Sequence, residues 1–372
     1  MPTRNFPFPI FIACLLLASA CKQTPPQITI SGHIEGWEDS ILYIGLPNED
    51  SYGTFDSFNY YDNDLSKYVS VKNGSFSWSQ PYNGPQELIL QIRGHMIPLF
   101  TGNTDIEIHG HYDSIADLRI TGSVAQQEFD NFKSAMMDTW KQELYLGGVL
   151  TKVSDTSRIM KEFTPKYDSV VALIKAKTKQ FIANHPGSIV SVGIIKDMTY
   201  DGDPTYLDSL FHLLTPDILA SPAGKRLEEK FVVLRRGAVG QPFRDFTQID
   251  VNGDTVRLGD FKGKYLLIYY WIGYAQAQNL EVLRLYNCFR QKGFTVLGVF
   301  MGEDKGQWKD IITWYALPWK QVSDLEGMHG SLAREYGIKR VPNNFLLDPK
   351  GVIIGRNMSM KELETKLCET VH

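Results

Sequence analysis

A run of apolar and aromatic residues, Tyr265-Leu266-Leu267-Ile268-Tyr269-Tyr270-Trp271, limits the fold of this chain more than any other feature. An unbroken run of this kind is typical of a strand covered on both faces, because a strand with one face in water alternates between apolar and polar residues. The C-terminal region, 237–372, is therefore predicted to be an α/β domain. After this strand the pattern predicts, in order, a helix, a strand, two helices, two strands and a last helix, over 277–290, 294–301, 305–315, 333–338, 344–347, 352–355 and 360–371.

The region from residue 27 to residue 122 has a different pattern, in which short segments alternate between apolar and polar residues. Ile28-Thr29-Ile30 and Phe76-Ser77-Trp78 are examples, and Asn73-Gly74 lies between two alternating segments. An Asn-Gly pair in that position is the strongest short-range signal for a β hairpin. Short strands at this spacing predict an all-β, sandwich-like domain over 27–122.

Residues 123–236 are predicted to be helical. Ser123, with Gln126 three residues later, is a capping-box start, and apolar residues then recur at helical spacing from Phe129 to Met136. No pattern in this region indicates an active site, so we interpret it as a connector and packing platform. Three further amphipathic helices are predicted over 170–182, 206–214 and 223–234.

The first residues of the chain carry an export signal. Arg4 provides a positive charge, and the apolar run from Phe6 to Ala20 is shorter than the roughly 20 residues that a membrane span needs. Small residues stand directly before Cys21, which resembles a bacterial lipobox. That resemblance implies a lipoprotein signal peptide over 1–20, a lipid on Cys21 and a polar, proline-bearing tether over 21–26. The alternative is a plain secretory peptide, cut at Ala18 to Ala20.

The lipobox interpretation places the protein in the cell envelope, held to a membrane by its lipid. Lys22 replaces the aspartate that retains many lipoproteins at the inner membrane. We therefore expect the outer membrane, on the side that faces the periplasm. The net charge is −4 and no long basic block is present, which argues against nucleic acid as a partner.

The last third of the chain contains several short motifs that occur together in one family. They are Asp260-Phe261-Lys262-Gly263-Lys264, Tyr270-Trp271, Phe294-Thr295-Val296-Leu297-Gly298-Val299, Leu317-Pro318-Trp319, Tyr336-Gly337-Ile338 and Val341-Pro342-Asn343-Asn344-Phe345-Leu346-Leu347-Asp348. With the predicted order of elements, they resemble the thioredoxin-like domain of membrane-anchored TlpA and ResA proteins. The β region before them resembles a domain that precedes such domains in Bacteroidota lipoproteins. The resemblance implies a thioredoxin-like fold and, for the family, thiol–disulfide oxidoreductase activity; no cofactor or metal is predicted.

The segment that should carry the redox chemistry departs from the family. The family has Trp-x-x-Trp-Cys-x-x-Cys, and this chain has Trp271-Ile272-Gly273-Tyr274-Ala275-Gln276-Ala277-Gln278. Ala275 thus stands at the position of the nucleophilic cysteine and Gln278 at that of the resolving cysteine. Exchange requires a thiolate to attack and a second thiol to resolve the mixed disulfide, and neither a methyl group nor an amide can do so. We predict that this segment is redox-inactive.

Two accessory features of the family are retained. Val341-Pro342 matches its cis-proline segment, which offers backbone groups to an extended peptide; a requirement of the strand start is an equally good interpretation. Glu281 matches an acidic residue that assists proton transfer in the family. Without thiols, we interpret it as a first-turn glutamate stabilised by the helix dipole. The resemblance implies a binding groove formed by Trp271, Tyr274, Gln276, Val341 and Pro342.

Few cysteines remain for other chemistry. Cys14 lies in the leader and Cys21 is the predicted lipidation site, which leaves Cys288 and Cys368. One pair is not a disulfide framework for so long a chain. Free cysteine is among the most buried residue types, so we predict two inert, buried thiols. A disulfide is the alternative, because the fold implied by the resemblance places both helices on one face of the sheet.

Two weaker candidates lie in the N-terminal region. His109 and His111 share a strand face, and Glu107 is the only obvious third ligand, so exposed histidines are a better interpretation than a metal site. The aromatic-rich segment Ser51 to Tyr61 is either a binding surface or a loop packed on its own domain.

Three functions are therefore compared. The first is a non-enzymatic peptide-binding or scaffold protein of the envelope, which is the function we favour. The second is a thiol–disulfide oxidoreductase that uses Cys288 or the thiols of a partner. The third is capture of a carbohydrate or peptide by the N-terminal β region. Fold analogy alone would favour the second, but the residues of the site do not support it.

Overall fold

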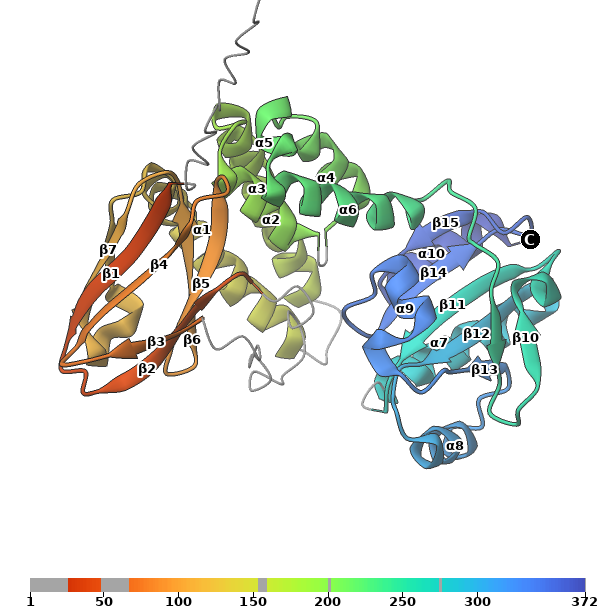
Figure 1. Ribbon diagram of the computed structural model, residues 1–372. Coiled ribbons are helices and arrows are strands. Elements are labelled where there is room, and N and C mark those ends of the chain that lie inside the picture. Colours follow the sequence, from red (N-terminus) through yellow and green to blue (C-terminus); the bar gives the residue numbers. More distant parts are fainter. Residues whose placement is uncertain (1–25, 48–66, 153–158, 200–201, 274–275, 372) are drawn as a thin grey trace, which may run out of the picture.

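The computed structural model describes residues 26–47, 67–152, 159–199, 202–273 and 276–371. The predicted signal peptide, the lipidated Cys21 and the segment Ser51 to Tyr61 lie outside these residues. Within the described part of the chain, no helix is both long and apolar enough to cross a membrane. A β sandwich, a helical region and an α/β domain follow one another along the chain (Figure 1).

The described N-terminal strands form two four-stranded sheets, β4-β1-β7-β8 and β3-β2-β5-β6. Their inner faces share one core, in which Ile30 and Ile108 of the first sheet join Leu42 and Leu90 of the second. The predicted sandwich-like region is thus sheet-rich, as expected. The strands are β1 (Gln27–Glu35), β2 (Ser40–Gly45), β3 (Tyr68–Val71), β4 (Ser75–Pro81), β5 (Gln86–Ile92), β6 (His95–Thr101), β7 (Ile106–His111) and β8 (Arg119–Thr121).

The Asn73-Gly74 turn forms, but it does not make the predicted hairpin within one sheet. Both residues have positive φ, 45° and 74°, and Lys72 and Ser75 exchange two backbone hydrogen bonds of 2.9 Å. Strand β3, which precedes the turn, belongs to one sheet, and β4, which follows it, belongs to the other. The turn therefore joins the two layers of the sandwich, which a local sequence signal does not distinguish from a hairpin.

The helical region lies between the sandwich and the α/β domain (Figure 1). Its core extends into the sandwich through Phe100 of β6, whose ring lies 4.7 Å from that of Phe129. The expected start at residue 170 was too late, since the second helix begins at Ile159 and accommodates Pro165. The helices are α1 (Val124–Lys152), α2 (Ile159–Asn184), α3 (Ile189–Met198), α4 (Pro204–Phe211), α5 (Pro216–Ala220) and α6 (Pro222–Arg236).

Helix α3 was not predicted from the sequence. Every residue from Ile189 to Ile195 is buried, so the helix has no polar face and no amphipathic period to recognise. The predicted capping box at Ser123 is only half formed. The Ser123 hydroxyl accepts from the Gln126 N–H at 3.3 Å, but Gln126 Oε1 instead accepts from the Phe100 N–H at 2.9 Å. The start of α1 is thereby attached to β6.

The described C-terminal strands form a five-stranded sheet, β13-β12-β11-β14-β15, beside a short β9-β10 hairpin. Strands β11 and β12 are parallel, whereas β14 is antiparallel to β11. This is the predicted thioredoxin-like order. The elements are β9 (Thr247–Ile249), β10 (Thr255–Arg257), β11 (Tyr265–Trp271), α7 (Gln276–Phe289), β12 (Phe294–Phe300), α8 (Lys305–Trp314), β13 (Lys320–Val322), α9 (Ser331–Tyr336), β14 (Asn343–Leu347), β15 (Ile353–Arg356) and α10 (Met360–Thr370).

Strand β11 is apolar throughout because its two faces belong to two different cores. Alternate residues from Leu266 to Tyr270 pack with Tyr336 and its neighbours on α9. The residues between them, from Leu267 to Trp271, pack with side chains of α7, α8 and α10. The expectation of a strand covered on both faces is confirmed.

Candidate functional site

The predicted site begins where β11 ends and α7 starts (Figure 1). Tyr274 and Ala275 lie outside the described residues, and so do the side chains of Gln276 and Ala277. Helix α7 nevertheless starts at Gln276, one residue after the position of the family's nucleophilic cysteine. Gln278, at the position of the resolving cysteine, is in the first turn and is half-buried.

Trp271 does not contribute to a binding surface, which corrects the sequence-based expectation. Its side chain is fully buried and its ring lies 5.1 Å from that of Phe300. The indole Nε1–H donates to Oε1 of Gln321, on β13, at 3.1 Å. Successive side chains of a strand point to opposite faces, so Trp271 faces away from the α9 side, to which its neighbour Tyr270 belongs. The ring of Trp271 therefore lies in the core that α7 and α8 cover. Trp271 is a core residue with its polar atom satisfied.

Asn279 is a buried polar residue that the sequence analysis did not identify. It is 1% exposed, and neither its Oδ1 nor its Nδ2 has a hydrogen-bond partner within the described part of the chain. Val282, Leu285 and Phe289 follow it at helical spacing and lie in the core. A polar residue in line with that apolar stripe was the available signal. Buried amides without partners are uncommon, so Asn279 marks the first turn of α7 as unusual.

The Val341-Pro342 segment lies in the loop that leads into β14, and its peptide bond is cis, as the family resemblance implied. Pro342 is exposed, whereas Val341 is half-buried and packs against the core on the α9 side. No backbone hydrogen bond involves the N–H or C=O of Val341 within the described residues. Val341 and Pro342 thus form a bend directly before β14, and the backbone polar groups of Val341 are not used in the sheet.

A polar cavity of about 420 Å³ opens beside this loop. Lys339, Arg340 and Asn343 line it from the loop side, and Lys175 of α2 lines it from the helical region. Oδ1 of Asn343 is buried and has no hydrogen-bond partner in the described structure. Arg356 of β15 also lines the cavity; its guanidinium donates to the Leu234 carbonyl at 3.2 Å, and burial lowers its pKa. The loop that carries Pro342 thus borders this cavity through Lys339, Arg340 and Asn343.

Glu281 is on the surface, in an ion-pair network. Its Oε2 accepts from Arg284 Nε at 3.1 Å, and the same guanidinium donates to both carboxylate oxygens of Glu364, on α10, at 2.8 and 2.9 Å. These hydrogen bonds raise the pKa of Arg284 and lower that of Glu364. Because α7 starts at Gln276, Glu281 lies beyond the first turn, and our interpretation as a first-turn residue on the helix dipole was wrong. It helps to tie α7 to α10.

Cys288 and Cys368 are both free and both exposed. The expectation of free thiols is confirmed, and the expectation of burial was wrong. Each lies on the outer face of its helix, next to core residues such as Leu285 and Leu367 that face inward. Cys288 is at the far end of α7, about 18 Å from the first turn at a rise of about 1.5 Å per residue.

The histidines of β7 make local contacts. His109 Nε2 lies 3.7 Å from Oε2 of Glu107, which confirms that the two share a face. His111 Nδ1 accepts from the backbone N–H of Asp113 at 3.2 Å. The described residues hold no cluster of three or more His, Cys, Asp or Glu side chains suited to a metal ion.

Comparison with known proteins identifies the family of the C-terminal region. Residues 239–356 match the AhpC/TSA family. The C-terminal region is an AhpC/TSA domain with the thioredoxin fold. The thiol-disulfide oxidoreductase ResA of Bacillus thuringiensis subsp. konkukian is 25% identical over 149 residues, which are 39% of this chain and 84% of that protein.

Other similar proteins carry related names. The thiol:disulfide interchange protein DsbE of Pseudomonas fluorescens biotype C is 28% identical over 116 residues, which are 31% of this chain and 64% of that protein. A solved structure, the thioredoxin domain of a thiol-disulfide oxidoreductase from Bacteroides vulgatus, is 30% identical and has a TM-score of 0.34. That match covers 36% of this chain and 99% of the solved one.

Proposed function

We propose that this chain is an envelope lipoprotein whose AhpC/TSA domain binds an extended peptide or a partner loop without thiol–disulfide exchange. The observation that carries the proposal is the Val341-Pro342 segment, which combines an exposed proline with backbone groups that make no backbone hydrogen bond in the described structure. An extended peptide can pair with such a segment by strand addition. The polar cavity beside Lys339, Arg340 and Asn343 supports a docked partner on the same side.

The residues at the start of α7 support binding rather than exchange. Ala275 and Gln278 occupy the positions of the two family cysteines, and the chain has no Cys-x-x-Cys segment. Backbone N–H groups at a helix start lack intrahelical partners and can donate hydrogen bonds to acceptor groups of a ligand. We still propose Tyr274 and Gln276 as contacts of the ligand. Trp271 is not part of the proposed groove, because its side chain is buried. Without a covalent step, we expect micromolar affinity, about −8 kcal/mol.

Reduction of insulin disulfides by the whole protein tests the absence of exchange activity. We expect no turnover above background, and some turnover after Ala275→Cys is combined with Gln278→Cys, because a thiolate and a resolving thiol are then both present. The matched control is a protein that keeps Ala275 and Gln278 and carries Cys288→Ser and Cys368→Ser. Robust turnover by the unaltered protein that is lost with Cys288→Ser would overturn the proposal in favour of an oxidoreductase.

Chemical-shift mapping with a library of extended peptides tests the groove. We expect shifts at Val341, Asn343 and Gln278, and none on the β sandwich. A Pro342→Ala variant should weaken binding, whereas Pro349→Ala, in the hairpin between β14 and β15, should not. Shifts that cluster on β1 to β8 and leave Val341 unmoved would favour ligand capture by the β sandwich.

The lipid anchor is proposed from Cys21 and tested at that residue. A buried acyl chain contributes about 0.8 kcal/mol per methylene, so Cys21→Ala should move the protein from the membrane fraction to the soluble fraction. Ser19→Thr leaves the thiol in place and serves as the control. A Cys21→Ala protein that stays in the membrane fraction after a salt wash would exclude the anchor. Fractionation of inner and outer membranes tests the outer-membrane location proposed from Lys22.

A further inference from the structure

Arg356, the last residue of β15, is a half-buried cation that forms no ion pair within the described residues. One of its terminal nitrogens, Nη1, donates to the Leu234 carbonyl at 3.2 Å, and its guanidinium carbon lies 5.4 Å from the centre of the Phe345 ring. Neither Nε nor Nη2 has a hydrogen-bond partner in the described part of the chain. A charge that is partly removed from water is usually paired, and this one retains unused donors.

The end of α6 provides the space for this guanidinium. Gly237, which follows the helix, has a φ of −89°, a value that any residue can adopt. A Cβ at that position would lie 2.8 Å from Nη1 of Arg356, so it is the guanidinium that requires a glycine there. The partial negative charge at the C-terminal end of α6 also favours a cation. The guanidinium is therefore held in a fixed position, with the helix end on one side only.

Two cavities meet at Arg356. One is the polar cavity of about 420 Å³ beside the Val341-Pro342 loop, and the other has a volume of about 230 Å³. Arg356 and Gly337 line both of them. The smaller cavity lies between α6 and α9, and its lining includes the apolar residues Val233, Leu234, Met328, Ala333 and Ile338. Ligand sites often combine an apolar surface with a few fixed polar groups, as the two cavities do at Arg356.

The polar cavity contains a second available cation and an available acceptor. Lys175 of α2 lies 5.5 Å from the centre of the Tyr206 ring and forms no ion pair among the described residues. Oδ1 of Asn343 is buried and has no hydrogen-bond partner in the described structure. Lys339 and Arg340 line this cavity too, but both already interact with other groups. Arg356 and Lys175 thus supply the charge that a ligand can use.

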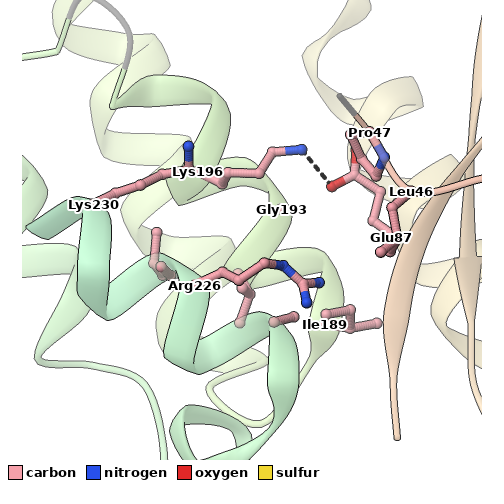
Figure 2. A pocket seen from close by; sticks show the side chains of 11 residues that line it. Leu46, Pro47, Glu87, Ile189, Gly193, Lys196, Arg226 and Lys230 are labelled. Atoms are coloured by element: carbon pink, nitrogen blue, oxygen red, sulfur yellow. Dashed lines mark hydrogen bonds and ion pairs between the residues drawn. The ribbon is translucent and has the colours of Figure 1, made fainter. Parts of the chain in front are cut away.

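A third cavity, of about 160 Å³, shows the contrasting case (Figure 2). It lies where α3 and α6 meet the edge of the β sandwich, and Nζ of Lys196 lies 2.7 Å from Oε2 of Glu87, a carboxylate that is 7% exposed. Arg226 and Lys230 also line it and also interact with other groups. The cations of this cavity are thus engaged within the chain, whereas Arg356 has no carboxylate partner.

We propose that Arg356 binds a carboxylate of the partner peptide and that the smaller cavity holds an apolar side chain of the same peptide. This inference rests on the function proposed above, since Arg340 and Asn343, on either side of the Val341-Pro342 loop, line the cavity that leads to Arg356. A guanidinium can donate two parallel hydrogen bonds to a carboxylate. Oδ1 of Asn343 accepts from a backbone N–H of the peptide. The carboxylate is either the C-terminus of the peptide or an acidic side chain next to the apolar one.

Three peptides of equal length separate these two sources. They are acetyl-Thr-Val-Thr-Val-Leu with a free C-terminal carboxylate, the same peptide as its C-terminal amide, and the amide of acetyl-Thr-Val-Thr-Glu-Leu. Calorimetric titration of the full chain gives the affinities. We expect one or both of the charged peptides to bind at least about tenfold more tightly than the neutral amide. Replacement of the last Leu by Ser should weaken binding about tenfold, because the apolar side chain is lost.

Variants of the two cations test the assignment. Arg356→Gln should remove the preference for charged peptides, and Arg356→Lys should restore only part of it, because an ammonium cannot form two parallel hydrogen bonds. Lys175 is exposed, so Lys175→Gln leaves the core intact, and it should weaken binding of the charged peptides about threefold. Lys161→Gln, at another exposed position of α2, is the control and should change nothing. Unchanged amide shifts in β11 and β12 would show that each variant is folded.

Amide and methyl shifts distinguish failure of this inference from failure of the proposed function. Shifts at Val341, together with methyl shifts at Val233 and Ile338, are expected with the charged peptides. Shifts at Val341 with equal affinity for all three peptides would overturn the carboxylate assignment and leave peptide binding in place. Absence of shifts at Val341 with every peptide would overturn both. A preference for charged peptides that survives Arg356→Gln would overturn the role of Arg356.

Discussion

The indole N–H of Trp271 donates to Oε1 of Gln321 across 50 residues of sequence, in a part of the core where Gln321 itself is only 3% exposed. Gly298 of β12 lies beside this bond, and a Cβ there would fall 2.0 Å from the same oxygen. Three neighbouring strands, β11, β12 and β13, thus share one polar contact within an apolar layer. The aromatic residue that the family resemblance assigned to a groove is used here to hold the sheet together.

Gly298→Ala is expected to destabilise the thioredoxin-like domain by about 2–3 kcal/mol, because the new methyl group displaces Gln321 from the indole. Gln321→Leu should cost less, about 1 kcal/mol, because it also removes the Gln321 Nε2, a buried donor without a described partner. Gly259→Ala is the control, since no described atom lies within 4 Å of the added Cβ. Urea unfolding, monitored through the hydrogen exchange of β11 and β12 amides, measures the loss of stability in each variant and so the order of the three costs. Equal costs for Gly298→Ala and Gly259→Ala would contradict it.

Asp250 should make the stability of the same domain depend on pH. Burial alone would raise the pKa of this carboxyl, but hydrogen bonds from Lys320 and from the N–H groups of Asp254 and Asn252 outweigh it and lower the pKa from 3.8. A lowered folded-state pKa contributes stability that is present above the unfolded value and is lost as the pH falls below it. The unaltered protein should therefore lose stability as the pH falls from about 5 to about 3.

Asp250→Asn should flatten this loss and lower stability at pH 7 by about 2–3 kcal/mol, because the hydrogen bonds to a charged acceptor are lost. Asp254→Asn, at an exposed side chain of the same turn, should preserve the pH dependence. Urea midpoints measured across the pH range provide the comparison. A fall of the same slope in the Asp250→Asn protein would show that other carboxyls cause it.

The sequence predicted those elements whose stability comes from a local pattern. The run from Tyr265 to Trp271 predicted a strand covered on both faces, and its alternate residues do enter two cores. Helix α3 escaped prediction because its residues are buried all round, so no period distinguishes its faces. Asn73-Gly74 predicted a turn correctly, but whether a turn stays in one sheet depends on distant strands.

The candidate site was less predictable because its determinants are contacts between distant residues. The burial of Trp271 depends on Gln321 and Phe300, which no spacing rule connects to it. The motif identified the Val341-Pro342 segment, but the polar cavity beside it requires Lys175 from another region of the chain. The cavity between Glu87 and Arg226 likewise exists only once α6 packs against β5.

Cys288 and Cys368 should react with a thiol reagent in the native protein, because both are exposed and free. Iodoacetamide labelling followed by peptide mapping should modify both sites without denaturant, and denaturant should not increase the yield at either. Single Cys288→Ser and Cys368→Ser variants assign the two signals. Labelling that appears only after unfolding, or only after reduction, would contradict the exposed, free thiols of the structure.

The ion pair between Glu87 and Lys196 leads to a prediction about the contact of the β sandwich with α3. Lys196→Met leaves a buried carboxylate without its closest cation and should cost about 3–5 kcal/mol at pH 7, whereas Glu87→Leu with Lys196→Met should cost much less. A carboxyl whose pKa is raised in the folded state makes the protein less stable as the pH rises. The loss of stability caused by Lys196→Met should therefore become smaller toward pH 5. Hydrogen exchange of α3 amides in urea measures both effects, with exposed Lys225→Met as control. A deficit that is independent of pH, or a double variant as unstable as Lys196→Met, would show that Glu87 is not the source.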